Sequence, residues 1–211
     1  MIRILLADDH PLVRAGIRAE LEANVDLSVI AEVGMADEAV QRASAERPDV
    51  AVLDVQLGAG SGLRACQQIT AAQPPCAVII LTAFDWDVYL AQAWAAGAAA
   101  FVIKSAETDV LAAIIRHVHA GRRAFTPEQL DRITTWQCDV AAPLATLTAR
   151  EMEVLRLLAD AATNQEIADE LHLAVKTVES HVRAVLTKLH LASRREVMLW
   201  TRRTRALLLL E

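Results

Sequence analysis

The sequence predicts an α/β fold, a doubly wound parallel sheet, followed by a smaller all-helical region. Three observations support this. Five short apolar runs alternate with segments of helical apolar spacing over the first 120 residues, and no hairpin signal separates them. The charge also changes sign along the chain: residues 1–120 carry 8 basic and 15 acidic side chains, whereas residues 174–205 carry 8 basic and 2 acidic. Two domains with different partners are therefore expected.

The apolar runs contain β-branched residues and no alternation of polar side chains, which is typical of strands buried on both faces. The clearest is Val50–Leu53, which ends at Asp54 and is followed by a glycine-rich turn. The expected strands are Arg3–Ala7, Leu27–Val33, Val50–Asp54, Ala77–Thr82 and Ala99–Ile103.

A helix is expected after each strand. Pro11 suits a first helical position, Pro74-Pro75 breaks the chain before the fourth strand, and Gly97 suits a helix end. The expected helices are Pro11–Leu21, Asp37–Glu46, Leu63–Ala72, Asp87–Ala96 and Thr108–Ala120.

The overall composition bounds the class of protein. In 211 residues, 54% hydrophobic and 23% charged side chains provide for a packed core, and the net charge is −6. No apolar run is long enough to span a bilayer, and strand-like residues begin at Ile2, where a signal peptide would start. The three cysteines lack disulfide or metal spacing, so we expect a cytoplasmic protein without membrane contact.

Polar residues follow the expected strands at one edge of the sheet, because parallel strands share the same carboxyl edge. They are Asp8, Asp9, Asp54, Thr82 and Lys104. Three neighbouring carboxylates repel one another unless a cation joins them, and Mg²⁺ is the natural choice for hard oxygen ligands. A carboxylate held near Mg²⁺ and a lysine is a competent nucleophile toward phosphorus.

These five positions, matched in order, resemble the signature of receiver domains in two-component response regulators over residues 1–120. The resemblance implies a flavodoxin-like sheet in which Asp54 accepts a phosphoryl group. It implies that Asp9, Asp54 and the Gln56 backbone carbonyl hold Mg²⁺, with Asp8 acting mostly through a coordinated water. It also implies that Thr82 and Phe101 form the switch pair. Receivers commonly carry Met-Pro where this chain has Leu57-Gly58, so we expect a more mobile loop.

The glycine-rich stretch Gly58–Gly62 lacks the spacing of a dinucleotide fingerprint or a P-loop, and we interpret it as a turn. Residues 121–145 are expected to be a linker with a short helix over Pro127–Thr135, capped by Thr126. Trp136 and Cys138 are unusual in a linker, and we expect them to pack on one of the domains.

Three capping boxes open helices in the last domain, residues 146–211: Thr148–Glu151, Thr163–Glu166 and Ser193–Glu196. Between the last two boxes, Val175–Leu189 has a valine-rich face opposite a polar and basic face. Two short helices joined by a tight turn, the second with a polar outward face, predict a helix-turn-helix.

Three short motifs of this domain closely resemble those of LuxR-type DNA-binding domains: Leu147–Glu151, Asn164–Ala168 and Lys176–His181. With the receiver, the chain resembles a NarL/FixJ-family response regulator. The resemblance implies that Glu179, Ser180 and Arg183 meet base edges in double-stranded DNA and that His181 packs within the domain. The residues implied to meet mostly phosphates are Lys176, Thr177, Asn164 and Lys188.

Two positions depart from the LuxR pattern. Ala174 replaces the usual Ser or Thr cap of the recognition helix, a loss that typically costs about 1 kcal/mol and that Thr177 would partly offset. Glu179 brings a negative charge into the groove, so it must accept from a cytosine amino group or be held by Arg183. In the family the last helix pairs two domains, and the leucines of 207–210 fit such an interface.

The predicted function is therefore a DNA-binding transcription regulator, not an enzyme, phosphorylated at Asp54 by a sensor histidine kinase and acting as a homodimer. RNA polymerase is left open as a further partner. A phosphohydrolase with an Asp nucleophile would want a second acid where this chain has Gln56. The remaining alternative is a LuxR-type factor with a receiver-like domain controlled by contact or dimerisation, independent of phosphate.

Overall fold

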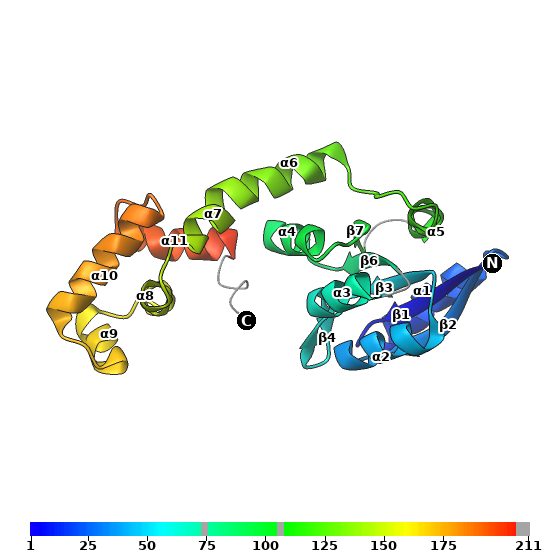
Figure 1. The fold of residues 1–211 in the computed structure, drawn as a ribbon, viewed down its shortest axis with the longest axis horizontal. Coiled ribbons are helices and arrows are strands. Elements are labelled where there is room, and N and C mark those ends of the chain that lie inside the picture. Colours follow the sequence, from blue (N-terminus) through cyan, green and yellow to red (C-terminus); the bar gives the residue numbers. More distant parts are fainter. Residues whose placement is uncertain (73–75, 105–107, 206–211) are drawn as a thin grey trace. The chain divides into compact units, whose positions relative to one another are not determined.

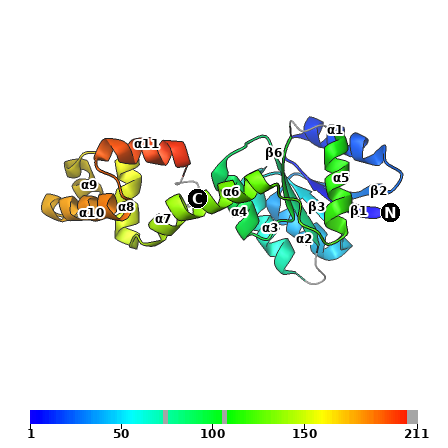
Figure 2. The ribbon, with the colours of Figure 1, turned by 90° about the horizontal axis from the view of Figure 1, so that it is seen from above.

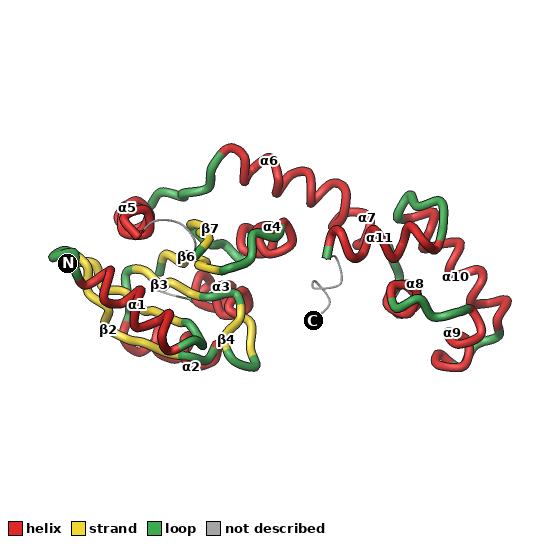
Figure 3. Tube along the Cα trace, turned by 180° about the vertical axis from the view of Figure 1, so that it is seen from behind, coloured by secondary structure: helices red, strands yellow, loops and turns green. Residues whose placement is uncertain are grey.

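A computed structural model describes residues 1–72, 76–104 and 108–205, which fall into two compact units that divide between Asp131 and Arg132. Pro74-Pro75 and the leucines of 207–210 lie outside the described residues. In the described part, strands occur only in the first unit (Figure 3). The α/β fold with a parallel five-stranded sheet, followed by a helical region, is confirmed.

The sheet has the order β2-β1-β3-β6-β7, and all neighbouring strands run parallel (Figure 1). Its strands are β1 (Ile2–Ala7), β2 (Leu27–Val33), β3 (Val50–Leu53), β6 (Ala77–Thr82) and β7 (Ala100–Ile103). Residues of β3 are completely or almost completely buried, as its unbroken apolar run predicts.

Helices cover both faces of the sheet. They are α1 (Pro11–Glu22), α2 (Ala36–Glu46), α3 (Gly62–Ala71), α4 (Asp87–Ala95) and α5 (Thr108–His119). Helix α1 contacts α5, while α3 contacts both α2 and α4, so the helices divide into two layers (Figure 2). Large side chains from β1, β3, β6, α1 and α5 form a core cluster that includes Leu21 and Ile115, both 0% exposed.

The glycine-rich stretch after β3 is a turn, as predicted, but it also carries a short ladder that was not predicted. A short antiparallel ladder joins β4 (Gln56–Leu57) to β5 (Gly60–Ser61), directly after β3. The reason is Gly58, whose φ of +59° lets the chain reverse within two residues. Two residues per strand are too few to give an alternating apolar pattern.

The linker is helical for most of its length. Helix α6 (Pro127–Trp136) continues through the π-helical segment η1 (Gln137–Ala141) into α7 (Ala142–Ala145). The predicted cap is present, because the Gln129 backbone N–H donates to Thr126 Oγ1 at 3.1 Å. Trp136 is buried as expected, whereas Cys138 is exposed, so the packing predicted for Cys138 is wrong.

The second unit contains four further helices: α8 (Ala149–Ala159), α9 (Asn164–Leu171), α10 (Val175–Lys188) and α11 (Arg194–Thr204). Complete capping boxes open α8 at Thr148 and α9 at Thr163. At α11 the Ser193 hydroxyl accepts from the Glu196 N–H, but the Glu196 carboxylate accepts from the Ala192 N–H, so the third box is only half formed. Among the described residues no side chain caps α10 at Ala174, so Thr177 does not replace the missing cap.

Candidate phosphoacceptor site and DNA-binding face

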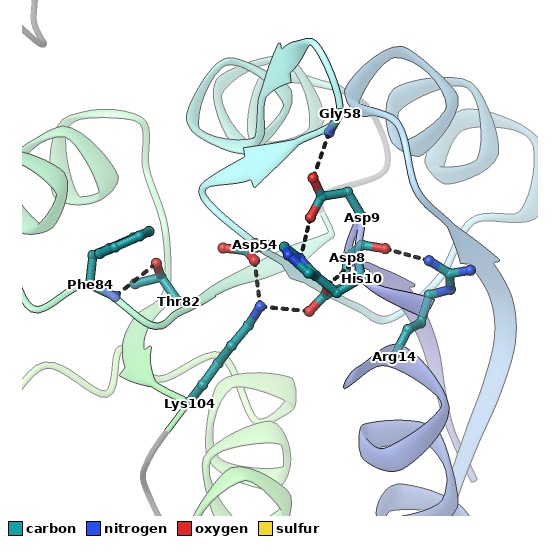
Figure 4. A network of polar contacts seen from close by, with 9 residues as sticks. All are labelled: Asp8, Asp9, His10, Arg14, Asp54, Gly58, Thr82, Phe84 and Lys104. Carbon is teal, nitrogen blue, oxygen red and sulfur yellow. Dashed lines mark hydrogen bonds and ion pairs between the residues drawn. The ribbon is translucent and has the colours of Figure 1, made fainter. Parts of the chain in front are cut away.

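Four strand ends position the polar cluster of the first unit. Asp8 follows β1, Asp54 follows β3, Thr82 ends β6 and Lys104 follows β7, and these strands are neighbours in the sheet. Backbone bonds extend the ladder beyond the strands: the Asp54 N–H donates to Ala7 O at 2.9 Å and the Lys104 N–H to Thr82 O at 2.8 Å. The side chains therefore start from a rigid edge (Figure 4).

One lysine lies between two buried carboxylates. Lys104 Nζ is 2.7 Å from Asp8 Oδ2 and also bonds Asp54 Oδ2, and Asp8 and Asp54 are 1% and 7% exposed. Burial raises the pKa of Asp54, against the ion pair with Lys104, which lowers it. Burial alone would lower the pKa of Lys104, but its bonds to Asp54 and Asp8 outweigh this and leave that pKa raised.

The cluster also fits a divalent metal ion. One ligand atom each from Asp8, Asp9, His10 and Asp54 lies within 4.8 Å of the others. Three carboxylates against one ammonium leave an excess of negative charge, and carboxylate oxygens are the donors that Mg²⁺ prefers. Gln56, whose carbonyl is implied as a further ligand, lies in the β4–β5 ladder opposite Ser61.

Sequence reasoning missed two neighbours of this cluster. His10 Nδ1 lies 2.7 Å from Asp9 Oδ1, and the His10 backbone N–H donates to Asp8 Oδ1 at 2.8 Å. Arg14, one turn into α1, donates from Nη1 to the Asp8 backbone carbonyl. The available signal was the position of His10 directly after Asp8 and Asp9, because a neighbouring hydrogen-bond donor can orient the two carboxylates.

The β4–β5 turn reaches the cluster through its backbone. The Gly58 N–H donates to Asp9 Oδ2 across 3.4 Å, a long hydrogen bond. Proline has no N–H and holds φ near −65°, so it could neither make this bond nor adopt the φ of +59° seen here. Gly62 is equally constrained, because a Cβ there would collide with the backbone carbonyl oxygen of Asp54.

The two residues implied as a switch pair are both buried. Thr82 is 0% exposed, and its Oγ1 accepts from the Phe84 backbone N–H at 3.3 Å. Phe101 is 3% exposed in β7, where it pairs in register with Ile80 of β6. The two side chains therefore come from adjacent strands of the sheet.

In the second unit, α9 and α10 form the predicted helix-turn-helix. Val178 and Val185 of α10 are completely buried. His181 is only partly exposed, as expected of a packing residue. The opposite face carries five predicted DNA-contacting residues, all exposed: Lys176, Thr177, Glu179, Ser180 and Arg183. In the described part of this unit no ion pair joins Glu179 to Arg183.

The other two predicted DNA contacts are engaged within the unit. Lys188 Nζ bonds Glu151 Oε2 at 2.6 Å and the Thr146 carbonyl at 3.0 Å. Asn164 Oδ1 accepts from Arg194 Nη1 at 3.1 Å. Hydrogen bonding to Lys188 and to the Thr148 backbone lowers the pKa of Glu151. Lys188 thus holds the C-terminal end of α10 against the start of α8.

Residues 4–116 match the response regulator receiver domain, and residues 145–201 match the bacterial regulatory proteins of the luxR family. The chain belongs to the response regulators with a LuxR-type output domain. It is a DNA-binding response regulator of a two-component system, as the order of the two family matches indicates.

Individual relatives cover nearly the whole response regulator. The DNA-binding transcriptional activator DevR/DosR of Mycobacterium tuberculosis is 36% identical, over 92% of this chain and 91% of its own. Response regulator protein VraR of Staphylococcus aureus is 33% identical, over 94% and 95%. The structure of the RcsB–DNA complex, at 24% identity, matches the fold with a TM-score of 0.63 over 95% of this chain and 98% of that one.

No helix within residues 1–72, 76–104 and 108–205 is both long enough and apolar enough to cross a membrane.

Proposed function

We propose that Asp54 of this response regulator accepts a phosphoryl group from a sensor histidine kinase, and that the modified protein binds promoter DNA as a homodimer. The observation that carries the proposal is the buried contact of Lys104 with both Asp54 and Asp8. Asp54 Oδ attacks phosphorus, the bond from phosphorus to the donor's leaving atom breaks, and an acyl phosphate forms. The Lys104 ammonium neutralises charge on the transferred oxygens.

Asp8, Asp9, Asp54 and the Gln56 carbonyl would hold Mg²⁺. When bound, the ion would supply positive charge at the phosphoryl oxygens. Before modification Asp8 keeps Lys104 at the acceptor, and His10 and Gly58 orient Asp9. After it, the Thr82 hydroxyl would donate to a phosphoryl oxygen and the Phe101 ring would follow Thr82 inward.

For the output domain, we propose that α10 enters the major groove. Glu179, Ser180 and Arg183 would meet base edges, and Lys176 and Thr177 would meet mostly phosphates. Lys188 and Asn164 would meet phosphates only through the N–H groups that their bonds within the unit leave over. Two copies would place their recognition helices on half-sites about 34–36 Å apart, one helical turn of DNA. DevR/DosR is named as a DNA-binding activator, which supports this role. The three free cysteines fit the reducing cytoplasm.

The test uses the full chain in three forms: wild type, Asp54→Asn and, as matched control, Asp37→Asn, an exposed aspartate of α2. Each is incubated with acetyl phosphate and Mg²⁺ and weighed by intact mass spectrometry. DNA sites are then selected with and without beryllofluoride and Mg²⁺. We expect one phosphoryl group and about tenfold tighter binding to a two-fold-related site for wild type and Asp37→Asn, and neither for Asp54→Asn.

Equal binding by all forms, loaded or not, would contradict the proposal. The receiver would then control DNA binding by protein contact or dimerisation, without phosphate.

A further inference from the structure

Residues 123–125, a few positions after α5, lie against the edge strand β7 of the sheet. Ala124 forms a parallel bridge with Ala100 of β7, and its N–H donates to Ala99 O at 2.8 Å. The two flanking side chains hold Trp94 of α4: the Arg123 guanidinium lies 4.6 Å from the indole centroid, and the Phe125 ring meets it edge-on at 5.0 Å. Residues 123–125 therefore extend the sheet by one short strand-like segment.

Immediately afterwards, one amide side chain joins α6 to the same strand. Gln129 Oε1 accepts from the Thr126 backbone N–H at 3.0 Å, while its Nε2 donates to the Phe101 carbonyl at 3.0 Å. The Gln129 backbone N–H completes the box by donating to Thr126 Oγ1. A carboxylate at this position would keep the first bond and lose the second, because it has no N–H to donate.

The strand that Gln129 binds is the one that carries Lys104. Phe101 lies three residues before Lys104, whose ammonium bonds Asp54 and Asp8. Phe101 is 3% exposed. Its backbone pairs with Ile80 of β6 on one side, and its carbonyl accepts from the Gln129 amide on the other. A shift of β7 that accompanies a change at Lys104 must either stretch the Gln129 bond or move the first turn of α6.

We propose that Gln129 is a positioning residue that couples the β7 strand to the first turn of the linker helix α6. Its side chain converts a displacement of the Phe101 carbonyl into a displacement of the Thr126 N-cap. The physiological use of this coupling rests on the proposed phosphorylation of Asp54, but the coupling itself is a property of the unmodified fold and is tested without phosphate.

The test is a double-mutant cycle on the full chain with wild type, Lys104→Met, Gln129→Glu and the double variant. Lys104→Met releases the end of β7 from Asp54 whether or not the protein takes up phosphate. Gln129→Glu is isosteric and keeps the helix cap. The readout is hydrogen exchange of the amides of residues 128–131, measured in millimolar Mg²⁺ and relative to those of α2 in the same unit, so that a general loss of stability in the first unit cancels. Gln137→Glu makes the same chemical change at an exposed linker position and is the control.

We expect Lys104→Met to accelerate exchange of residues 128–131 by about threefold or more in the wild-type and Gln137→Glu backgrounds. In the Gln129→Glu background the same change should have no effect on these amides. An equal acceleration in both backgrounds, or no acceleration in the wild-type background, would overturn the coupling.

The same four proteins are incubated with acetyl phosphate and Mg²⁺ as an independent arm. Failure of wild type to gain a phosphoryl group would remove the proposed function and leave the exchange result intact. A phosphoryl gain without the Gln129-dependent exchange would remove the coupling and leave the proposed function intact.

Discussion

Two lysines of this response regulator hold buried carboxylates, in opposite electrostatic settings. Lys188 has one carboxylate, Glu151, and one carbonyl, Thr146 O, so its charge is balanced. Lys104 faces Asp8 and Asp54, with Asp9 beside them, so its single charge is outnumbered. The Lys188 pair stabilises the fold of the second unit. The Lys104 cluster keeps an excess of negative charge, which a bound metal ion would balance.

The comparison explains why burial alone does not identify a functional site. Glu151 is 7% exposed, the same fraction as Asp54. Yet hydrogen bonding to Lys188 lowers the pKa of Glu151, while burial raises the pKa of Asp54 despite its bond to Lys104. The two pKa shifts differ in direction because hydrogen bonding dominates at Glu151 and burial dominates at Asp54.

The largest expected effect is that of Lys104→Met. Removing the ammonium leaves neighbouring buried carboxylates without a cation, so the free energy of unfolding of the first unit should fall by about 3 kcal/mol in EDTA. Millimolar Mg²⁺ should restore much of the loss. The measurement is the urea dependence of hydrogen exchange in β1 and β3 peptides, and a loss that Mg²⁺ leaves unchanged would contradict the metal site.

Lys188→Met should lower the free energy of unfolding of the second unit by about 2 kcal/mol, because the Glu151 carboxylate loses its charged partner. Here Mg²⁺ should have no effect. The control is Lys176→Met, an exposed lysine of the same helix, which should change this free energy by less than about 0.5 kcal/mol. Equal losses for both variants, followed in α8 and α10 peptides, would show that Lys188 is only a surface charge.

A smaller change is expected at the start of α10. Ala174→Ser supplies the missing cap and should raise the free energy of unfolding of the second unit by about 1 kcal/mol. The same urea series measures it, with Ala174→Val as the control that adds bulk without an acceptor. A Ser variant no more stable than the Val variant would show that another group already satisfies these N–H groups.

The smallest effect is the pH dependence of the Glu151 pair. Because the folded-state pKa of Glu151 lies below its ordinary 4.5, the pair stabilises the fold above that pH and loses this contribution as pH falls through the lowered value. The α8 peptides of wild type should therefore lose more stability than those of Lys188→Met as the pH falls below 4.5. Parallel losses in the two proteins would assign the acid sensitivity to other carboxyls.

The sheet and the cluster were predictable because both depend on a short-range rule. An unbroken apolar run such as Val50–Leu53 specifies a buried parallel strand, and parallel strands bring Asp8, Asp54 and Lys104 to one edge. Their assigned roles remain predictions. The β4–β5 ladder could not be predicted, because two residues per strand form no pattern and the ladder depends on the φ of Gly58.

The intramolecular bonds of Lys188 and Asn164 could not be predicted from the sequence for a different reason. Helical spacing places a side chain on a face, but it does not say whether that face meets solvent or a neighbouring helix at its end. Lys188 lies at the last position of α10, where α8 is within reach of its ammonium. The contact between Gln129 and Phe101 likewise joins segments whose proximity only the folded sheet edge creates.

Gly62 has a consequence for how natural and engineered variation in this protein should be interpreted. Any side chain at this position would collide with the backbone of Asp54, the proposed phosphoacceptor. A saturation library scored by transcription would therefore mark residue 62 as intolerant, alongside Asp54, although the glycine offers no group to a phosphoryl donor. Intolerance at residue 62 would reflect the collision of a side chain with the Asp54 backbone. It would therefore also appear in an assay that measures folding alone.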